Sequence, residues 1–244
     1  PALEAAFGSN RDPFRLYLAG SRGALEAGRR YVDSMALSGI TIGIYLGHVN
    51  ELWGAVPQGA QASWFRPQTC EDPSFNSTCF LFLGAAFTRE KLWDRHQEVV
   101  NRLRGSIEAR RAEDPEADVD LMEATVRFLE AYKTLIQGDY RAARQGLAEL
   151  RTRNDAVGGR ARLAMGEMEA AQGRVEEAIR HYRSSQRGYQ RPRAVLELAR
   201  LSERAGRPEE ARRYWERFLV ITRSGDPDLP QTVEAREALQ RLAQ

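Results

Sequence analysis

The sequence predicts an all-α protein, in which an N-terminal helical domain is followed by an α-solenoid, a stack of helix pairs, with a capping helix at its end. Two observations predict this class. A pattern of small and large residues recurs in the second half at intervals of 35 and 33 residues, and apolar residues elsewhere return at helical spacing. A hydrophobic content of 42% with 29% charged residues fits a folded, soluble chain and excludes a disordered one.

Charge and hydropathy exclude further classes. The 36 basic and 34 acidic residues leave a net charge of +2, and all basic residues except Lys91 and Lys133 are arginines. A nearly neutral chain without a nucleic-acid-binding motif predicts no nucleic-acid partner. The longest apolar stretch, Met35 to Val49, contains polar residues and is shorter than the roughly 20 residues of a membrane span. We therefore expect no transmembrane segment.

Residues 1–112 are predicted to form the N-terminal helical domain. Apolar spacing favours helices over Pro13–Ser34 and Gly39–Trp53, whereas residues 54–78 have no period and contain three prolines, which predicts a long loop. A further helix is expected to begin at Thr88. It carries an apolar stripe at helical spacing, formed by Leu92, His96, Val99, Val100, Leu103 and Ile107.

Two cysteines lie in the predicted loop and just after it. Cys70 and Cys79 are nine residues apart in a stretch rich in Pro, Asn, Ser and Thr, a spacing that fits a short disulfide-closed loop. Such a bond places the protein in an oxidising compartment, so we expect a periplasmic or secreted location. The alternative is two free thiols in a cytoplasmic protein. The chain starts at Pro1 without an initiator Met, which leaves open a removed signal peptide or lipid anchor.

An acidic stretch over residues 113–123 is predicted to connect the two parts, with Asp118 or Asp120 capping a helix that begins at Leu121. The repeat follows it. Three glycines are each preceded by a small residue seven positions earlier and followed by an Ala after five positions and a large apolar residue after nine. In chain order these sets are Ala131, Gly138, Ala143 and Leu147; Gly166, Gly173, Ala178 and Tyr182; and Ala199, Gly206, Ala211 and Trp215.

This pattern resembles the tetratricopeptide repeat (TPR), a 34-residue helix-turn-helix unit. The resemblance implies repeats over residues 124–157, 159–192 and 192–225, with a capping helix over 231–242 that covers the last apolar face. It also assigns the glycines to turns and the small and large residues to packing between helices. The first repeat departs from the pattern, because Glu130 and Thr134 stand where Leu and Tyr are usual, so its leading helix belongs equally to the preceding domain.

A second resemblance covers residues 44–132. The order of I-Y-L-G-H-V-N-E-L, a W-F-R-P-Q-T-C loop, the helix L-W-D-R-H-Q-E-V-V-N-R-L, an acidic Pro turn and M-E-A-T-V-R-F-L-E-A-Y is similar to that of small periplasmic immunity proteins that block secreted peptidoglycan amidases. This resemblance implies an inhibitor whose N-terminal domain, residues 1–123, blocks the active site of a hydrolase.

The arginines of the second and third repeats have two interpretations. Residues 159–225 contain 15 arginines and nine glutamates, which is compatible with a solvated face of ion pairs or with an electropositive groove. Repeat arrays bind extended peptides in the curve formed by their first helices. The candidates for contacting an acidic partner segment there are Arg160, Arg162, Arg193 and Arg200.

No catalytic motif, metal-ligand cluster or cofactor fingerprint occurs, so we predict a protein that is not an enzyme and needs neither metal nor cofactor. The predicted function is a protein-protein interaction scaffold or adaptor of the bacterial cell envelope. Besides the inhibitor, one alternative remains, a hydrolytic enzyme that uses an N-terminal cleft around His48, Glu51 and His96. We interpret His96 itself as a packed histidine, because it lies on an apolar stripe.

Overall fold

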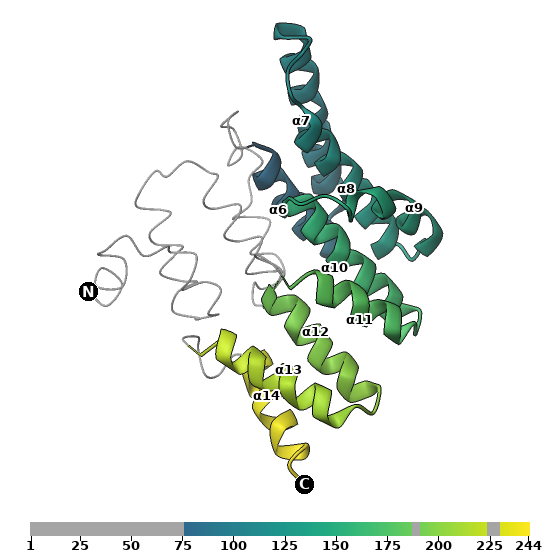
Figure 1. Ribbon diagram of the computed structural model, residues 1–244. Helices are drawn as coiled ribbons and strands as arrows, with labels where there is room; N and C mark the ends of the chain where they lie inside the picture. The colour runs from purple at the N-terminus through teal and green to yellow at the C-terminus, as the bar shows by residue number, and fades with distance from the viewer. Residues whose placement is uncertain (1–75, 187–190, 224–229) are drawn as a thin grey trace, which may run out of the picture.

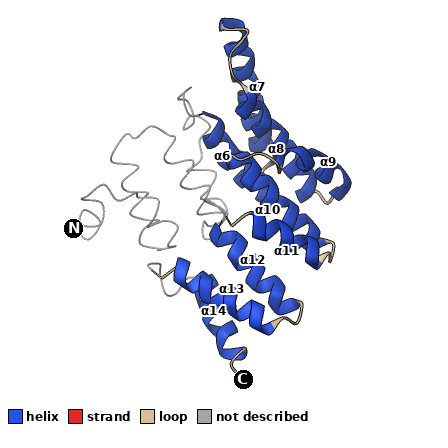
Figure 2. Ribbon diagram, viewed as in Figure 1, coloured by secondary structure: helices blue, strands red, loops and turns tan. Residues whose placement is uncertain are grey.

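The computed structural model describes residues 76–186, 191–223 and 230–244, and every regular element in these ranges is a helix (Figure 2). The all-α class is therefore confirmed for this part of the chain. The helices are α6 (Asn76–Arg89), α7 (Trp93–Glu113), α8 (Asp120–Ile136), α9 (Tyr140–Leu150), α10 (Ala156–Ala171), α11 (Val175–Ser184), α12 (Arg191–Arg204), α13 (Pro208–Ile221) and α14 (Pro230–Arg241).

Several predictions concern residues that the structure does not describe. The expected helices Pro13–Ser34 and Gly39–Trp53, the loop up to residue 75, and Cys70 all lie outside the described ranges. Cys79 lies on α6. The disulfide therefore stays a prediction.

Two boundaries near residue 88 were predicted wrongly. The helix α6 begins at Asn76, inside the expected loop, and continues through Thr88 to Arg89, and α7 begins only at Trp93. Lys91, with φ 58°, lies in the turn between the two helices. The apolar run from Phe80 to Phe87 is buried on all sides of α6, so it lacks the alternation of polar and apolar residues that marks a surface helix.

Consecutive helices pack as three pairs, α8 with α9, α10 with α11, and α12 with α13, and the pairs follow one another in chain order (Figure 1). Three residues join the helices within each pair. Neighbouring pairs are in contact through α8, α9 and α10, and through α11 and α12, while α14 packs against α13. Upstream, α6 and α7 pack against each other and against α8.

The same turn closes all three pairs. Gly138, Gly173 and Gly206 have φ values of 88°, 72° and 68°, in the left-handed region that disfavours side chains with a Cβ. The amide of the residue after each glycine donates to a carbonyl five residues earlier. These bonds join Asp139 to Thr134, Arg174 to Glu169 and Arg207 to Ser202, each at 2.9 Å, and they complete the usual glycine-terminated helix end.

Small residues allow close approach within each pair. Ala143, Ala178 and Ala211 are fully buried, as is Ala199. A Cβ on Gly166 would lie 2.6 Å from Cε1 of Tyr182, so the ring of α11 lies directly on the backbone of α10. In the first pair the arrangement is reversed. There the glycine, Gly146, lies on the second helix α9, and the Cβ of Ala131 on α8 packs against it. Leu147, Tyr182 and Trp215, at equivalent positions, are all buried.

One apolar cluster extends from Phe80 on α6 to Ala238 on α14. Within this cluster, α8 shares its apolar side chains with α6 and α7 as well as with α9, and the division predicted at residue 112 stays a prediction. Of the predicted connector, residues 114–119 join α7 to α8, and α8 begins one residue before the predicted start. None of the helices in the described ranges is both long and apolar enough to cross a bilayer.

The contact between Gly166 and Tyr182 gives a stability prediction. We expect Gly166→Ala to lower the free energy of unfolding by about 1–2 kcal/mol, because the cost of overpacking against the ring exceeds the gain in helix propensity. Gly105→Ala is the matched control. Gly105 lies inside α7 with open space where a Cβ would stand, so that variant should gain up to about 1 kcal/mol.

Urea unfolding measures both variants. Adding Tyr182→Leu to Gly166→Ala should recover part of the loss, since Leu147 occupies the equivalent position in the first pair. Equal stabilisation by Gly166→Ala and Gly105→Ala would contradict the close packing.

Candidate protein-binding surfaces

A row of polar side chains links the first helix of each pair to the next. It joins α6, α8, α10, α12 and α14 along one side of the stack, and we call this side the inner face. The row consists of Arg89, Tyr132, Glu167, Arg193, Glu197, Arg200 and Glu234.

The first half of the row connects α6 to α8 and α10. Nη2 of Arg89 donates to the hydroxyl of Tyr132 at 3.0 Å and to Oε1 of Glu167 at 2.9 Å. The Tyr132 hydroxyl lies 3.5 Å from the second oxygen of Glu167. Because Tyr132 is buried and the two charged groups are mostly covered, this contact is shielded from the solvent that weakens surface pairs.

The second half connects α10 to α12 and α14. Nη2 of Arg193 lies 3.1 Å from Oε1 of Glu197 and 3.9 Å from Oε1 of Glu167. Arg200 donates to Glu197 at 2.9 Å and, through Nε and Nη2, to the two oxygens of Glu234 at 2.8 and 2.6 Å. This forked pairing is the strong geometry of guanidinium and carboxylate, and it raises the pKa of Arg200.

The four arginines predicted to contact a partner are all engaged within the chain. Arg193 and Arg200 belong to the inner row. Arg160 is 2% exposed, and its guanidinium carbon lies 4.4 Å from the ring centroid of Phe82 on α6. Arg162 donates to the carbonyls of Arg151 and Arg153 at 2.7 and 2.9 Å. Partner binding stays a prediction for all four arginines. To bind a partner, each guanidinium would have to replace its present contact within the chain by a contact with that partner.

A buried carboxylate holds the second pair together away from the inner row. The side chain of Glu169 on α10 is 1% exposed and pairs with Arg144 of α9 at 2.6 Å and with Arg174, which precedes α11. Burial raises the pKa of Glu169, but hydrogen bonds from the two arginines lower it below its usual value. Glu169 is therefore ionised at neutral pH and joins α9, α10 and the turn before α11.

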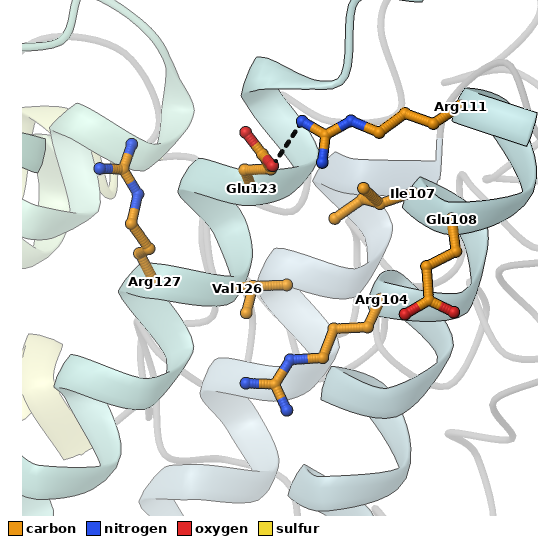
Figure 3. A pocket seen from close by; sticks show the side chains of 7 residues that line it. All are labelled: Arg104, Ile107, Glu108, Arg111, Glu123, Val126 and Arg127. Carbon is orange, nitrogen blue, oxygen red and sulfur yellow. Dashed lines mark hydrogen bonds and ion pairs between the residues drawn. The ribbon is translucent and has the colours of Figure 1, made fainter. Parts of the chain in front are cut away.

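A second surface is the groove between α7 and α8 (Figure 3), which encloses about 490 Å³. Ile107 and Val126 lie at its floor, each 7% exposed, and polar side chains form its walls. Arg111 faces Glu123 across the groove and donates to it at 2.8 Å. The charged lining residues are Arg104, Glu108, Arg111, Glu123 and Arg127. Three guanidinium groups and two carboxylates suit a polar segment of mixed charge.

This groove was not predicted, although the residues that line it follow a pattern in the sequence. Arg104, Glu108 and Arg111 recur at spacings of four and three residues on α7, and Glu123 and Arg127 recur at four residues on α8. Each set therefore lies on one helix face. The packing of α7 against α8 brings the two faces together, and the sequence does not contain that information.

His96 on α7 is a packed histidine, as predicted. Its side chain is 1% exposed, and Nδ1 lies 2.7 Å from Oγ1 of Thr88, which also donates to the carbonyl of Gly84 at 2.7 Å. Burial, with a smaller contribution from Lys133, lowers the pKa of His96 to about 4. Because His48 and Glu51 lie outside the described residues, the cleft of the hydrolase alternative is not tested.

Among the residues that the structure describes, no group of three or more His, Cys, Asp or Glu side chains is arranged to hold a metal ion. Comparisons with protein-family models, with curated proteins and with solved structures find no match. Function is therefore inferred from the geometry of the chain itself.

The buried imidazole predicts a pH dependence of stability. The pKa of His96 is about 4 in the folded state and 6.5 in an ordinary environment, so folding favours the neutral form. Its contribution, at most about 3 kcal/mol, is complete above pH 6.5 and is lost as the pH falls from 6.5 to 4. We expect His96→Gln to lower stability at pH 7 and to flatten this part of the profile.

Urea unfolding at intervals between pH 4 and 7.5 tests this expectation. Burial also lowers the pKa of His181 on α11. His181→Gln is therefore the control, because it shows how much of the pH dependence comes from this other histidine. Parallel profiles for the wild-type chain and His96→Gln would show that His96 does not cause the dependence.

Proposed function

We propose that this protein is a non-catalytic interaction scaffold, in which residues 124–244 form a tetratricopeptide-like solenoid that binds an acidic segment of a partner protein. The observation that carries the proposal is the threefold recurrence of one helix pair. Gly138, Gly173 and Gly206 adopt the same positive φ, and the alanine five residues after each is fully buried. Stacked pairs of this kind present a continuous surface whose size suits an extended peptide.

The inner face supports recognition of carboxylates. Arg193 has the loosest pairing in the row, with Glu167 at 3.9 Å, so a partner carboxylate can replace Glu167 at low cost. Arg200 is held more firmly by Glu234. We therefore propose Arg193 as the main contact and Arg200 as a residue that both positions α12 and contributes charge. A partner carboxylate that replaces Glu167 restores the ion pair of Arg193, whereas an apolar segment does not. The exchange therefore favours acidic partner segments over apolar ones.

We extend the proposal to the cell envelope of a bacterium, on the basis of the spacing of Cys70 and Cys79. A disulfide there would tie the chain before α6 to α6 itself, which supports an oxidising compartment. Thiol labelling of the purified, unfolded chain with and without reductant tests this part, because free thiols in the absence of reductant would remove the argument.

The test of binding begins with a partner captured from the native source, identified by mass spectrometry and purified. Calorimetry then compares wild-type chain with Arg193→Gln, which should bind about tenfold to 100-fold more weakly because a charge-assisted contact is lost. Arg180→Gln is the matched control, since Arg180 lies on α11 and its side chain is 72% exposed. Equal affinity of all three proteins would reject the inner face.

Arg200 allows its two roles to be separated. Arg200→Glu combined with Glu234→Arg exchanges the two charges and preserves the pair between α12 and α14. The exchange also places a carboxylate beside Glu197, with which Arg200 pairs at 2.9 Å, so some thermal stability is lost and the comparison uses the exchanged protein below its thermal transition. If Arg200 contacts the partner, the folded exchanged protein still binds weakly. Full recovery of affinity in the exchanged protein would show that Arg200 acts only by joining the helices.

A further inference from the structure

Two ion pairs close the groove between α7 and α8 at its ends. Arg111 pairs with Glu123 at 2.8 Å, and Arg104 pairs with Glu130. The arginines are seven residues apart on α7, and the glutamates are seven residues apart on α8 in the opposite order, so the two helices run antiparallel here. Seven residues of helix rise by about 10 Å, which is the length of groove between the two pairs.

Apolar side chains occupy the middle of this stretch. Ile107 on α7 and Val126 on α8 lie midway between the two pairs in sequence, and they form the floor of the groove (Figure 3). The volume of about 490 Å³ lies within the range of about 300–1,000 Å³ that is typical of ligand sites. The groove therefore has an apolar centre with a charged pair at each end.

The ion pairs decide which charge the groove offers to a ligand. Arg104 and Arg111 are neutralised across the groove, and Arg127 pairs with Glu149 of α9 at 3.5 Å. Glu108 stands between the two arginines of α7, on the α7 side of the groove (Figure 3), and it is the charged lining residue to which the described part of the chain supplies no ion pair. The charge that remains is negative, although arginines outnumber glutamates among the lining residues.

Carboxylate oxygens around the floor are available as acceptors. Arg111 donates to Oε1 of Glu123, and Arg104 donates to Oε1 of Glu130. The second oxygen of each of these carboxylates, and both oxygens of Glu108, accept no hydrogen bond from the described residues. An ionised carboxylate can accept several hydrogen bonds, so a cation in the groove finds acceptors on both walls without breaking either pair.

We propose that this groove binds an arginine side chain from a basic segment of a partner protein. The methylene stem of the arginine packs on Ile107 and Val126, while its guanidinium group donates to Glu108 and to the free oxygen of one of the two bridging glutamates. Long basic side chains combine an apolar stem with a charged head. The guanidinium fork suits acceptors on two walls, whereas lysine presents a point charge.

An acidic segment suits the groove less well. A partner carboxylate would contact Arg104 or Arg111 only in place of Glu130 or Glu123, and Glu108 would repel it. That exchange would also release a pair that joins α7 to α8. The groove and the inner face therefore favour partner charges of opposite sign, and binding at one does not require binding at the other.

Methyl NMR of the full chain measures binding at the floor. We would label the isoleucine and valine methyl groups and assign two signals with Ile107→Leu and Val126→Ala. The probe is the peptide acetyl-Gly-Leu-Arg-Leu-Gly-amide, and its match carries citrulline, which has the shape of arginine without the charge. At millimolar concentration the arginine peptide should shift both signals, and the citrulline peptide should bind about tenfold more weakly because a charge-assisted contact is lost.

Glu108→Gln tests the carboxylate that sets the sign of the groove. This variant should bind the arginine peptide about tenfold more weakly than the wild-type chain. Glu113→Gln is the matched control and should bind normally, because Glu113 is exposed on the same helix but does not line the groove. Both variants should keep the wild-type thermal transition, since the described residues supply an ion pair to neither carboxylate.

Three results would overturn the proposal. Unshifted signals of Ile107 and Val126 in the presence of the arginine peptide would show that the floor takes no such ligand. Equal affinity for the arginine and citrulline peptides would show that charge has no part in binding. Tighter binding of the corresponding glutamate peptide would show that the groove prefers acidic segments.

Arg193→Gln separates the groove from the proposed function. The variant should lose affinity for the acidic partner of the inner face and bind the arginine peptide as the wild-type chain does. An equal loss of affinity for the peptide would show that the peptide binds at the inner face and would overturn the groove as its site.

Discussion

The arrangement of the described helices depends on how closely the two members of a pair can approach. Tyr182 can lie on the backbone of α10 only because position 166 has no side chain, and Ala131 fits against α9 only because position 146 has none. The turn glycines act with these small residues, since a left-handed residue lets the chain reverse within three positions. Close pairs in turn bring equivalent residues of successive pairs within reach of each other.

That reach sets the pattern of polar contacts. Tyr132 and Glu167 are 35 residues apart, and Arg200 and Glu234 are 34 apart, so each contact joins positions separated by about one helix pair. On the other layer, Arg207 pairs with Glu176, which lies 31 residues earlier. An exposed pair of this kind adds little to stability, and it acts mainly on the rotation of one pair against the next. The half-buried contacts of the inner face fix it more firmly, because solvent screens them less.

The sequence predicted most of what is local in this fold. The helix pairs, their turn glycines and the last helix follow from short-range spacing, and the structure places α8 to α14 close to the predicted ranges. The boundary between α6 and α7 was wrong because the run from Phe80 to Phe87 is apolar on every side and gives no period. The run is buried by α7 and α8. The first of these helices follows a turn that the sequence did not indicate, and the second is distant in sequence.

The candidate sites were harder to predict than the helices, because the position of an arginine in the sequence does not show which side chain it contacts. Arg160 and Arg193 occupy equivalent positions in the second and third pairs, yet one is buried over Phe82 and the other pairs with Glu197. The spacing of the helix pairs also predicts contacts between side chains. Residues about 34 positions apart are neighbours in a stack of such pairs, so the pairing of Arg200 with Glu234 was within reach of a comparison between repeats.

Self-pairing changes what the arginine excess means for binding. Residues 159–225 carry more arginines than glutamates, but on the inner face Arg193 and Arg200 already have carboxylates from Glu167, Glu197 and Glu234. A partner carboxylate therefore gains only the difference between its own contact and the one it replaces. That difference is largest where the existing pair is loosest, between Arg193 and Glu167 at 3.9 Å, and it is lost for a poorly placed carboxylate, so the paired face discriminates by geometry more than by charge.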